Sequence, residues 1–196
     1  MSFIPRLKGK ITQSVLESLL AHVKYRVVPL GIEEVVRDVT TLSGEKYAEL
    51  NLSTTLRNLP DYFVAKSDLK KTWLVEVKYR NRWSPTVIEW LGKTLYEQVL
   101  QWQPLHLVLF LGEAAQITGT PASRLGVCKM VVNDNGELGI LRRVNQHQEL
   151  FHPWNEMTWA LMSRFQDVFE EVAEQSESTL ATAISALKLE ELDEAA

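Results

Sequence analysis

The apolar run Leu105-His-Leu-Val-Leu-Phe-Leu111 constrains the fold most strongly. A continuously apolar segment of this length is typical of a strand that is buried on both faces of a sheet. Before it, Ser84-Pro85 predicts the start of a helix that continues to about Trp102, with Pro104 ending it. Residues 73–80 predict an earlier strand, so the order strand, helix, strand favours a parallel crossover. We therefore expect an α/β fold.

The rest of the chain predicts further strands and two more helices. Ile11–Val23 has the apolar spacing of a helix with Thr12 as its N-cap, and Trp154–Val172 has the spacing of a second amphipathic helix. The segment 31–39 is compatible with either helix or strand. Expected strands are Tyr25–Leu30, Tyr47–Leu52, Asp61–Ala65, and a hairpin of Val127–Val132 and Leu138–Val144 around Asn133-Asp-Asn-Gly136.

Composition favours one domain that ends in an acidic tail. The chain has 196 residues and is 45% hydrophobic, which is enough for one substantial core. No segment has the pattern of a signal peptide or a membrane span, so we expect a cytoplasmic protein without a membrane partner. The expected domain covers residues 1–172, with its core at about 10–112 and additions at 113–172. Residues 173–196 would form an acidic tail that either extends the last helix or is disordered.

Charge is distributed unevenly along the chain. Residues 170–196 carry eight acidic side chains and one lysine, a net charge of −7, so residues 1–169 have 20 basic and 17 acidic side chains, a net charge of +3. A weakly basic body is compatible with a phosphate-backbone ligand. Six basic residues also cluster in or beside residues 66–82, although a solvated turn would explain three of them equally well: Lys66, Lys70, Lys71, Lys78, Arg80 and Arg82.

Two carboxylates and a lysine are placed where they could converge. Pro60-Asp61 precedes one expected strand, and Glu76 and Lys78 are two residues apart in the other, so these two side chains point to the same face. A hairpin across Ala65–Thr72 would bring Asp61 beside them. Two acidic oxygens and one amine on a sheet are suited to a Mg²⁺ site for phosphodiester hydrolysis. An exposed strand whose Glu and Lys are only solvated is the competing interpretation.

This pattern resembles the PD-(D/E)XK nuclease superfamily, and Glu76-Val-Lys78-Tyr-Arg80 is similar to the third motif of Holliday-junction resolvases. The resemblance covers roughly residues 10–112. It implies a restriction-endonuclease-like mixed β-sheet flanked by helices, to which a C-terminal hairpin and helix are added. It also implies a Mg²⁺- or Mn²⁺-dependent nuclease that acts on DNA in repair, recombination or restriction, with RNA left open as a substrate.

The resemblance assigns roles to individual residues. Asp61, Glu76 and the backbone carbonyl of Val77 would be the metal ligands, and Lys78 would be catalytic. Because adjacent carboxylates raise the pKa of a lysine, we expect Lys78 to position groups and stabilise charge rather than to abstract a proton. Residues assigned by weaker signals are Gln98 as a further catalytic residue, Glu17 as a further metal ligand from the first helix, and Arg80, Arg82 and Lys71 as nucleic-acid contacts. In the first helix, Gln13 lies nearer than Glu17 to the position that the resemblance implies.

The remaining reactive and aromatic side chains have structural interpretations. Cys128 is expected in a buried strand, and His106 in the core; His147 and His152 have no metal-ligand partner at a convincing spacing. Core packing is also the better explanation for four of the six tryptophans, namely Trp90, Trp102, Trp154 and Trp159. Trp83, next to Arg82, is the one kept as a candidate for base stacking.

Two other functional interpretations remain open at the level of sequence. One is a non-catalytic nucleic-acid-binding or dimerisation module that retains the fold, and the other is a coincidental motif in an unrelated α/β domain. Only the first of these, like the nuclease, requires Asp61, Glu76 and Lys78 to converge. A homodimer is also expected, through the second helix (Trp154, Trp159, Leu161 and Phe165) and the hairpin at Asn135-Gly136.

Overall fold

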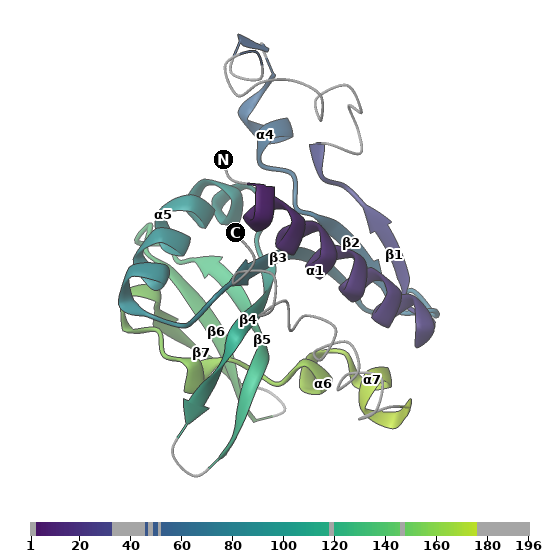
Figure 1. Ribbon diagram of the computed structural model, residues 1–196. Helices are drawn as coiled ribbons and strands as arrows, with labels where there is room; N and C mark the ends of the chain where they lie inside the picture. The colour runs from purple at the N-terminus through teal and green to yellow at the C-terminus, as the bar shows by residue number, and fades with distance from the viewer. Residues whose placement is uncertain are drawn as a thin grey trace.

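A seven-stranded mixed sheet forms the centre of the molecule in the computed structural model, which describes residues 3–32, 46, 49–50, 52–117, 120–145 and 148–175 (Figure 1). The strands are adjacent in chain order, and only β3 and β4 pair in parallel. Their bounds are β1 Arg26–Pro29, β2 Tyr62–Ala65, β3 Thr72–Arg80, β4 Leu105–Ile117, β5 Thr120–Val132, β6 Leu138–Asn145 and β7 Gln148–Pro153. The α/β class and the β3–β4 crossover are thus confirmed.

Two long helices pack on opposite faces of this sheet: α1 (Phe3–His22) and α5 (Pro85–Trp102). Alternate residues of β4 separate the two cores. Val108 and Phe110 pack with α1, whereas Leu107 and Leu109 pack with α5. All four are at most 1% exposed, so β4 is buried on both faces, as its continuous apolar run predicts.

The helix boundaries follow local capping chemistry. Ser84 Oγ accepts a hydrogen bond from the N–H of Val87, and Pro85 occupies the first turn of α5, so this start was correctly predicted. The prediction for α1 was wrong at its N-terminus. Thr12 lies inside the helix, where its hydroxyl donates to the carbonyl of Lys8.

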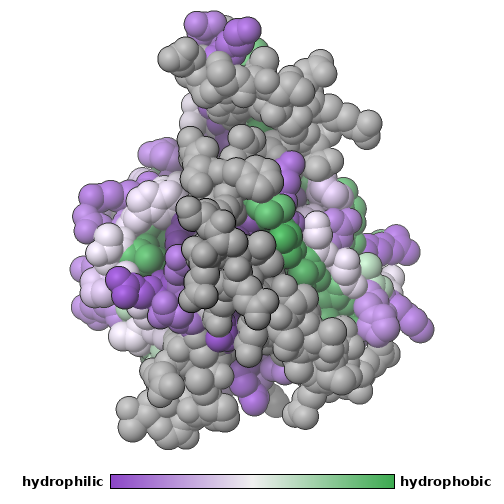
Figure 2. All heavy atoms as spheres, viewed as in Figure 1, coloured by the Kyte–Doolittle hydropathy of each residue, from purple (hydrophilic) through white to green (hydrophobic). Residues whose placement is uncertain are grey.

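A band of hydrophobic residues follows α1 on the surface seen in Figure 2.

Four predictions fall partly or wholly outside the described residues. Segment 31–39 lies outside the described residues beyond Ile32, as do His147 and most of the acidic tail. Of the expected strand Tyr47–Leu52, only Glu49, Leu50 and Leu52 are described, and none is in a strand. A short helix, α4 (Thr54–Arg57), follows with Ser53 as its N-cap.

The C-terminal part differs from the predicted single helix. Instead of one helix over Trp154–Val172, the structure has 3-10 turns at Trp154–Glu156 and Trp159–Leu161, then α6 (Phe165–Val168) and α7 (Glu170–Gln175). Each break lets an aromatic ring enter a separate core, because Trp159 joins the α5 side and Phe165 the α1 side. The edge strand β7 was not predicted.

The aromatic side chains expected at a dimer contact are occupied within the chain itself. Trp154 and Trp159 are 5% and 6% exposed, and Phe165 is 1% exposed. They therefore do not offer the spare apolar surface on which the predicted dimer contact was based, and the homodimer remains a prediction.

In the described part of the chain, no helix has the length and apolarity that crossing a membrane requires.

Candidate active site

The β2–β3 hairpin brings the predicted carboxylates and lysine together at its open end. Ala65 pairs with Thr72 next to the turn, and Tyr62 pairs with Val75 at the last registered position. Continuing this register would place Pro60 opposite Val77, but β2 ends first. In its place, the Oδ2 of Asp61 accepts a hydrogen bond of 2.7 Å from the N–H of Val77. The side chain of Asp61 thus substitutes for a strand partner.

The backbone of Asp61 is fixed from two further directions. Its carbonyl accepts from the N–H of Leu30, at the end of β1, at 2.9 Å. Its own N–H donates to Oε2 of Glu76 at 3.3 Å. The main chain of Asp61 is therefore held both by β1 and by the carboxylate of Glu76, which fixes its position as a precise site needs.

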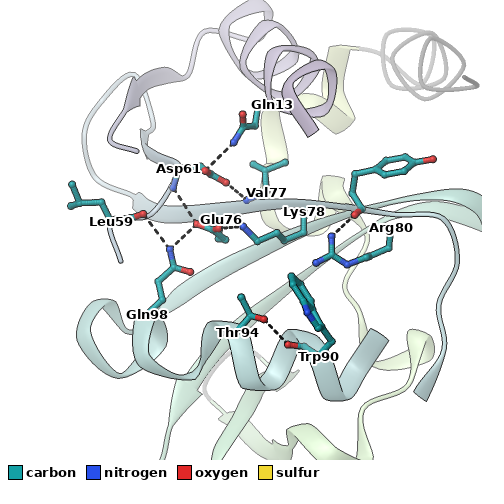
Figure 3. Close-up of polar contacts among 11 residues, drawn as sticks. Gln13, Leu59, Asp61, Glu76, Val77, Lys78, Arg80, Trp90, Thr94 and Gln98 are labelled. Carbon is teal, nitrogen blue, oxygen red and sulfur yellow. Dashed lines mark hydrogen bonds and ion pairs between the residues drawn. The ribbon is translucent and has the colours of Figure 1, made fainter. Parts of the chain in front are cut away.

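Glu76 is the most buried charged group of the cluster. It is 4% exposed, and both its oxygens have donors. The ammonium of Lys78 forms an ion pair with Oε1, while Gln98 from α5 donates to Oε2 at 2.8 Å. Figure 3 shows Gln98 reaching Glu76 from the helix, with its amide also bonded to the carbonyl of Leu59 at 3.2 Å. The sequence-predicted role of Gln98 at the site therefore has a geometric basis.

The first helix contributes Gln13 rather than Glu17. The amide of Gln13 donates to Oδ1 of Asp61 at 2.9 Å, as Figure 3 shows. Across the described residues, no set of three or more His, Cys, Asp or Glu side chains is positioned to share a metal ion, so Glu17 is not grouped with Asp61 and Glu76. The helix thus supplies a neutral donor that orients one carboxylate.

Electrostatics at the site are unbalanced. Burial, and then the negative charge of Glu76, raise the pKa of Asp61 to about 7, although Lys78 and the Val77 N–H act in the opposite direction. Burial lowers the pKa of Lys78, but Glu76 and Asp61 outweigh it, and the net pKa is raised. One lysine does not compensate for the buried carboxylate of Glu76 and the half-buried one of Asp61. An additional cation would complete the charge balance of this cluster.

The donor set fits a hard divalent cation. Both backbone groups of a strand residue point toward the same neighbouring strand. The Val77 carbonyl therefore faces the side on which its N–H meets Asp61, where β2 has already ended. Two carboxylates and one carbonyl form an all-oxygen set, and Mg²⁺ usually takes one or two carboxylates and leaves its other positions to water and phosphate.

The three basic residues assigned to nucleic acid lie in different surroundings. Arg80 continues the face of Glu76 and Lys78, and its guanidinium lies 4.2 Å from the ring centre of Trp90. Arg82 is exposed. Lys71 lies at the hairpin turn just before β3, five residues or roughly 16 Å from Glu76, where it forms a 2.8 Å ion pair with Glu170. The structure therefore groups only Arg80 with the site.

Two tryptophan predictions were wrong. Trp90 is 49% exposed and is not part of the core, whereas Trp83 packs edge-on against Trp159 with ring centres 5.5 Å apart. Trp83 therefore supports the core on the α5 side, and Trp90 is the ring available beside the site. Cys128 and His106 are buried in strands, as predicted; burial raises the pKa of Cys128 and lowers that of His106 to about 4.

Comparison of the chain with protein-family models, with curated proteins and with solved structures finds no match.

Proposed function

We propose that this protein is a metal-dependent phosphodiesterase of the nuclease type, acting on DNA, with a restriction-endonuclease-like core. The observation that carries the proposal is the fixed, charge-unbalanced cluster of Asp61, Glu76 and Lys78, held by Gln13 and Gln98. A coincidental motif does not require these side chains to meet. Apart from the short helix α4, the order α1, β1, β2, β3, α5, β4, with β3 and β4 parallel, is the order of elements that the resemblance to PD-(D/E)XK nucleases implies.

Each residue of the cluster would have a defined task. Asp61, Glu76 and the Val77 carbonyl would hold Mg²⁺, which when bound polarises a phosphate oxygen and lowers the pKa of a water molecule. Gln13 and Gln98 would keep the carboxylates oriented through their amide donors. Lys78, protonated because of its raised pKa, would orient the scissile phosphate and stabilise the charge that develops on it.

A cleavage assay with purified protein tests the proposal. Supercoiled plasmid, linear duplex, single-stranded DNA and a four-way junction would be incubated with Mg²⁺, with Mn²⁺ and with EDTA. We expect cleavage of at least one substrate with either metal and none with EDTA. Glu76→Gln should abolish it, whereas Glu137→Gln, which neutralises an exposed carboxylate in the β5–β6 turn, should not.

Calorimetric titration with Mg²⁺ separates the proposal from the non-catalytic alternative. Binding of the ion by the wild-type protein and its loss in Glu76→Gln, together with cleavage, support a nuclease. Metal binding without cleavage of any of these substrates would favour the nucleic-acid-binding module. Cleavage that persists in EDTA or in Glu76→Gln would contradict the proposed chemistry.

A further inference from the structure

Two rows of side chains face each other along β3 and α5 (Figure 3). On β3 the members are two residues apart and so point to one face, and on α5 they are four residues apart and so lie on one side of the helix. Contacts at both ends fix the register of the two rows. The rows are Glu76, Lys78 and Arg80 on β3, and Gln98, Thr94 and Trp90 on α5.

At one end of these rows lies the cluster of Asp61, Glu76 and Lys78. At the other end, a cation lies beside an aromatic ring. Gln98 contacts Glu76 at 2.8 Å, while the Arg80 guanidinium covers the Trp90 ring at 4.2 Å. Arg80 lies four residues along the strand from Glu76, a rise of about 13 Å. At the stacked rise of about 3.4 Å per nucleotide, this distance corresponds to about four nucleotides.

Trp90 is exposed, and its ring belongs to neither hydrophobic core. Trp154 and Trp159, which pack against the same core as α5, are 5% and 6% exposed, whereas Trp90 is 49% exposed. In the described part of the chain, the other exposed large hydrophobic residues are all aliphatic. Tryptophan with one face toward solvent supplies a large stacking surface, which is how proteins bind unpaired bases.

Arg80 retains its charge for a ligand. Its guanidinium donates to the carbonyl of Tyr79, and it makes no salt bridge with any residue that the structure describes. Arginine positioned over an aromatic ring holds that ring in place, and its remaining N–H groups fit phosphate oxygens. Stacking surface and phosphate donor are therefore adjacent.

We propose that Arg80 and Trp90 form a subsite for an unpaired nucleotide of single-stranded DNA, within about four nucleotides of the scissile phosphate. A base would stack on the exposed surface of Trp90, and Arg80 would contact the neighbouring phosphate. The inference rests on the proposed function, because it takes the ligand to be the nuclease substrate. In a blunt duplex the bases are already stacked on one another, so the subsite selects single strands or unpaired ends.

Fluorescence anisotropy in EDTA tests the subsite without cleavage. The probes are a fluorescein-labelled oligothymidylate of about 15 nucleotides and a blunt duplex of the same length. Trp90→Ala should weaken binding of the single strand by between about 5-fold and 100-fold. Trp90→Phe should retain most of the affinity because it keeps a ring. Leu100→Ala, which removes a comparably exposed side chain from the same helix, should have no effect.

A second measurement on the wild-type protein does not depend on the folding of a variant. A single 2-aminopurine placed in the oligothymidylate should lose fluorescence when the protein binds, because the base stacks on the Trp90 ring. Unchanged 2-aminopurine fluorescence at saturation would overturn the proposal. So would wild-type affinity of Trp90→Ala for the single strand, or an equal loss of affinity for the blunt duplex.

These outcomes are separable from those of the cleavage assay. Trp90-dependent binding of single strands by a protein that cleaves nothing would remove the proposed function and leave a binding subsite. Metal-dependent cleavage by a protein whose single-strand affinity is independent of Trp90 would leave the proposed function and remove the subsite.

Discussion

The two ends of the β2–β3 hairpin both place carboxylates beside lysines, but they differ in burial and in charge balance. At the open end, the ammonium of Lys78 pairs with Glu76 and acts on Asp61 only through its charge, in a largely buried setting. At the turn end, two glutamates of α7 meet two lysines at the surface. Those pairs are Glu170 with Lys71 and Glu171 with Lys66.

The pKa values respond in opposite directions at the two ends. Burial and Glu76 raise the pKa of Asp61 to about 7. At the turn, the hydrogen bond from Lys71 lowers the pKa of Glu170. Burial works against the same change at Glu171, but the bonds from Lys66 and Tyr25 outweigh it, and the pKa is lowered. Ion pairs that are balanced at a surface are structural, whereas a buried excess of negative charge is suited to bind a cation.

The largest expected contrast between the two ends is in catalysis. Asp61→Asn, Glu76→Gln and Lys78→Met should each lower kcat/KM for DNA cleavage by at least about 1000-fold. The double variant of Asp61 and Glu76 should be little worse than either single variant, because residues that act as a unit fail together. Glu170→Gln and Lys66→Met, at the turn, are the matched controls and should retain activity. Wild-type activity in any of the three site variants would remove that residue's assigned role.

A smaller contrast is expected in the pH dependence of stability, measured by urea unfolding in EDTA. The pKa of Asp61 is about 7 in the folded protein, whereas an ordinary aspartate has a pKa of 3.8. The protonated carboxyl of Asp61 therefore contributes its full stabilisation below about pH 4, and this contribution is lost as the pH rises through 7. Asp61→Asn should therefore gain stability relative to wild type between pH 5 and pH 8. Each unit of pKa difference is worth about 1.4 kcal/mol, so the gain is at most a few kcal/mol.

The turn end should show the opposite sign. Since folding lowers the pKa of Glu170 and of Glu171, their contribution is present above 4.5, the ordinary pKa of a glutamate, and is lost as the pH falls below it. For the open end, the free energy of unfolding is compared between the wild type and Asp61→Asn. If this difference is the same at pH 5 and pH 8, the charge imbalance at the open end is contradicted.

The smallest effect is expected from the surface pairs themselves. Removing the pair of Lys71 and Glu170, both about half exposed, should cost less than about 1 kcal/mol in the free energy of unfolding. High salt should reduce this cost further, because exposed charges are screened. A double-mutant cycle with Lys71→Met and Glu170→Gln at low and high salt measures it. A salt-independent coupling of several kcal/mol would show that the turn is not the simple surface region described above.

Local pattern determined most of the elements that carry the site. The hairpin of β2 and β3, the capped start of α5 at Ser84-Pro85 and the buried strand β4 were predicted because their signals are short-range: alternation, capping chemistry and a continuous apolar run. Glu76 and Lys78 share a face because of strand periodicity alone. For this reason, the acidic motif itself could be assigned before any tertiary contact was known.

Long-range packing decided the remainder. Gln13 and Asp61 are 48 residues apart, so no local pattern could show that an amide of α1 orients a carboxylate of the hairpin. The segment from Trp154 to Val172 has helical spacing, yet its rings enter two cores on opposite faces of the sheet, and one continuous helix cannot supply both. Likewise, the spacing in α5 places Trp90 near the apolar stripe of the helix. Only the tertiary structure shows that the Trp90 ring is 49% exposed and lies beside the guanidinium of Arg80 on β3.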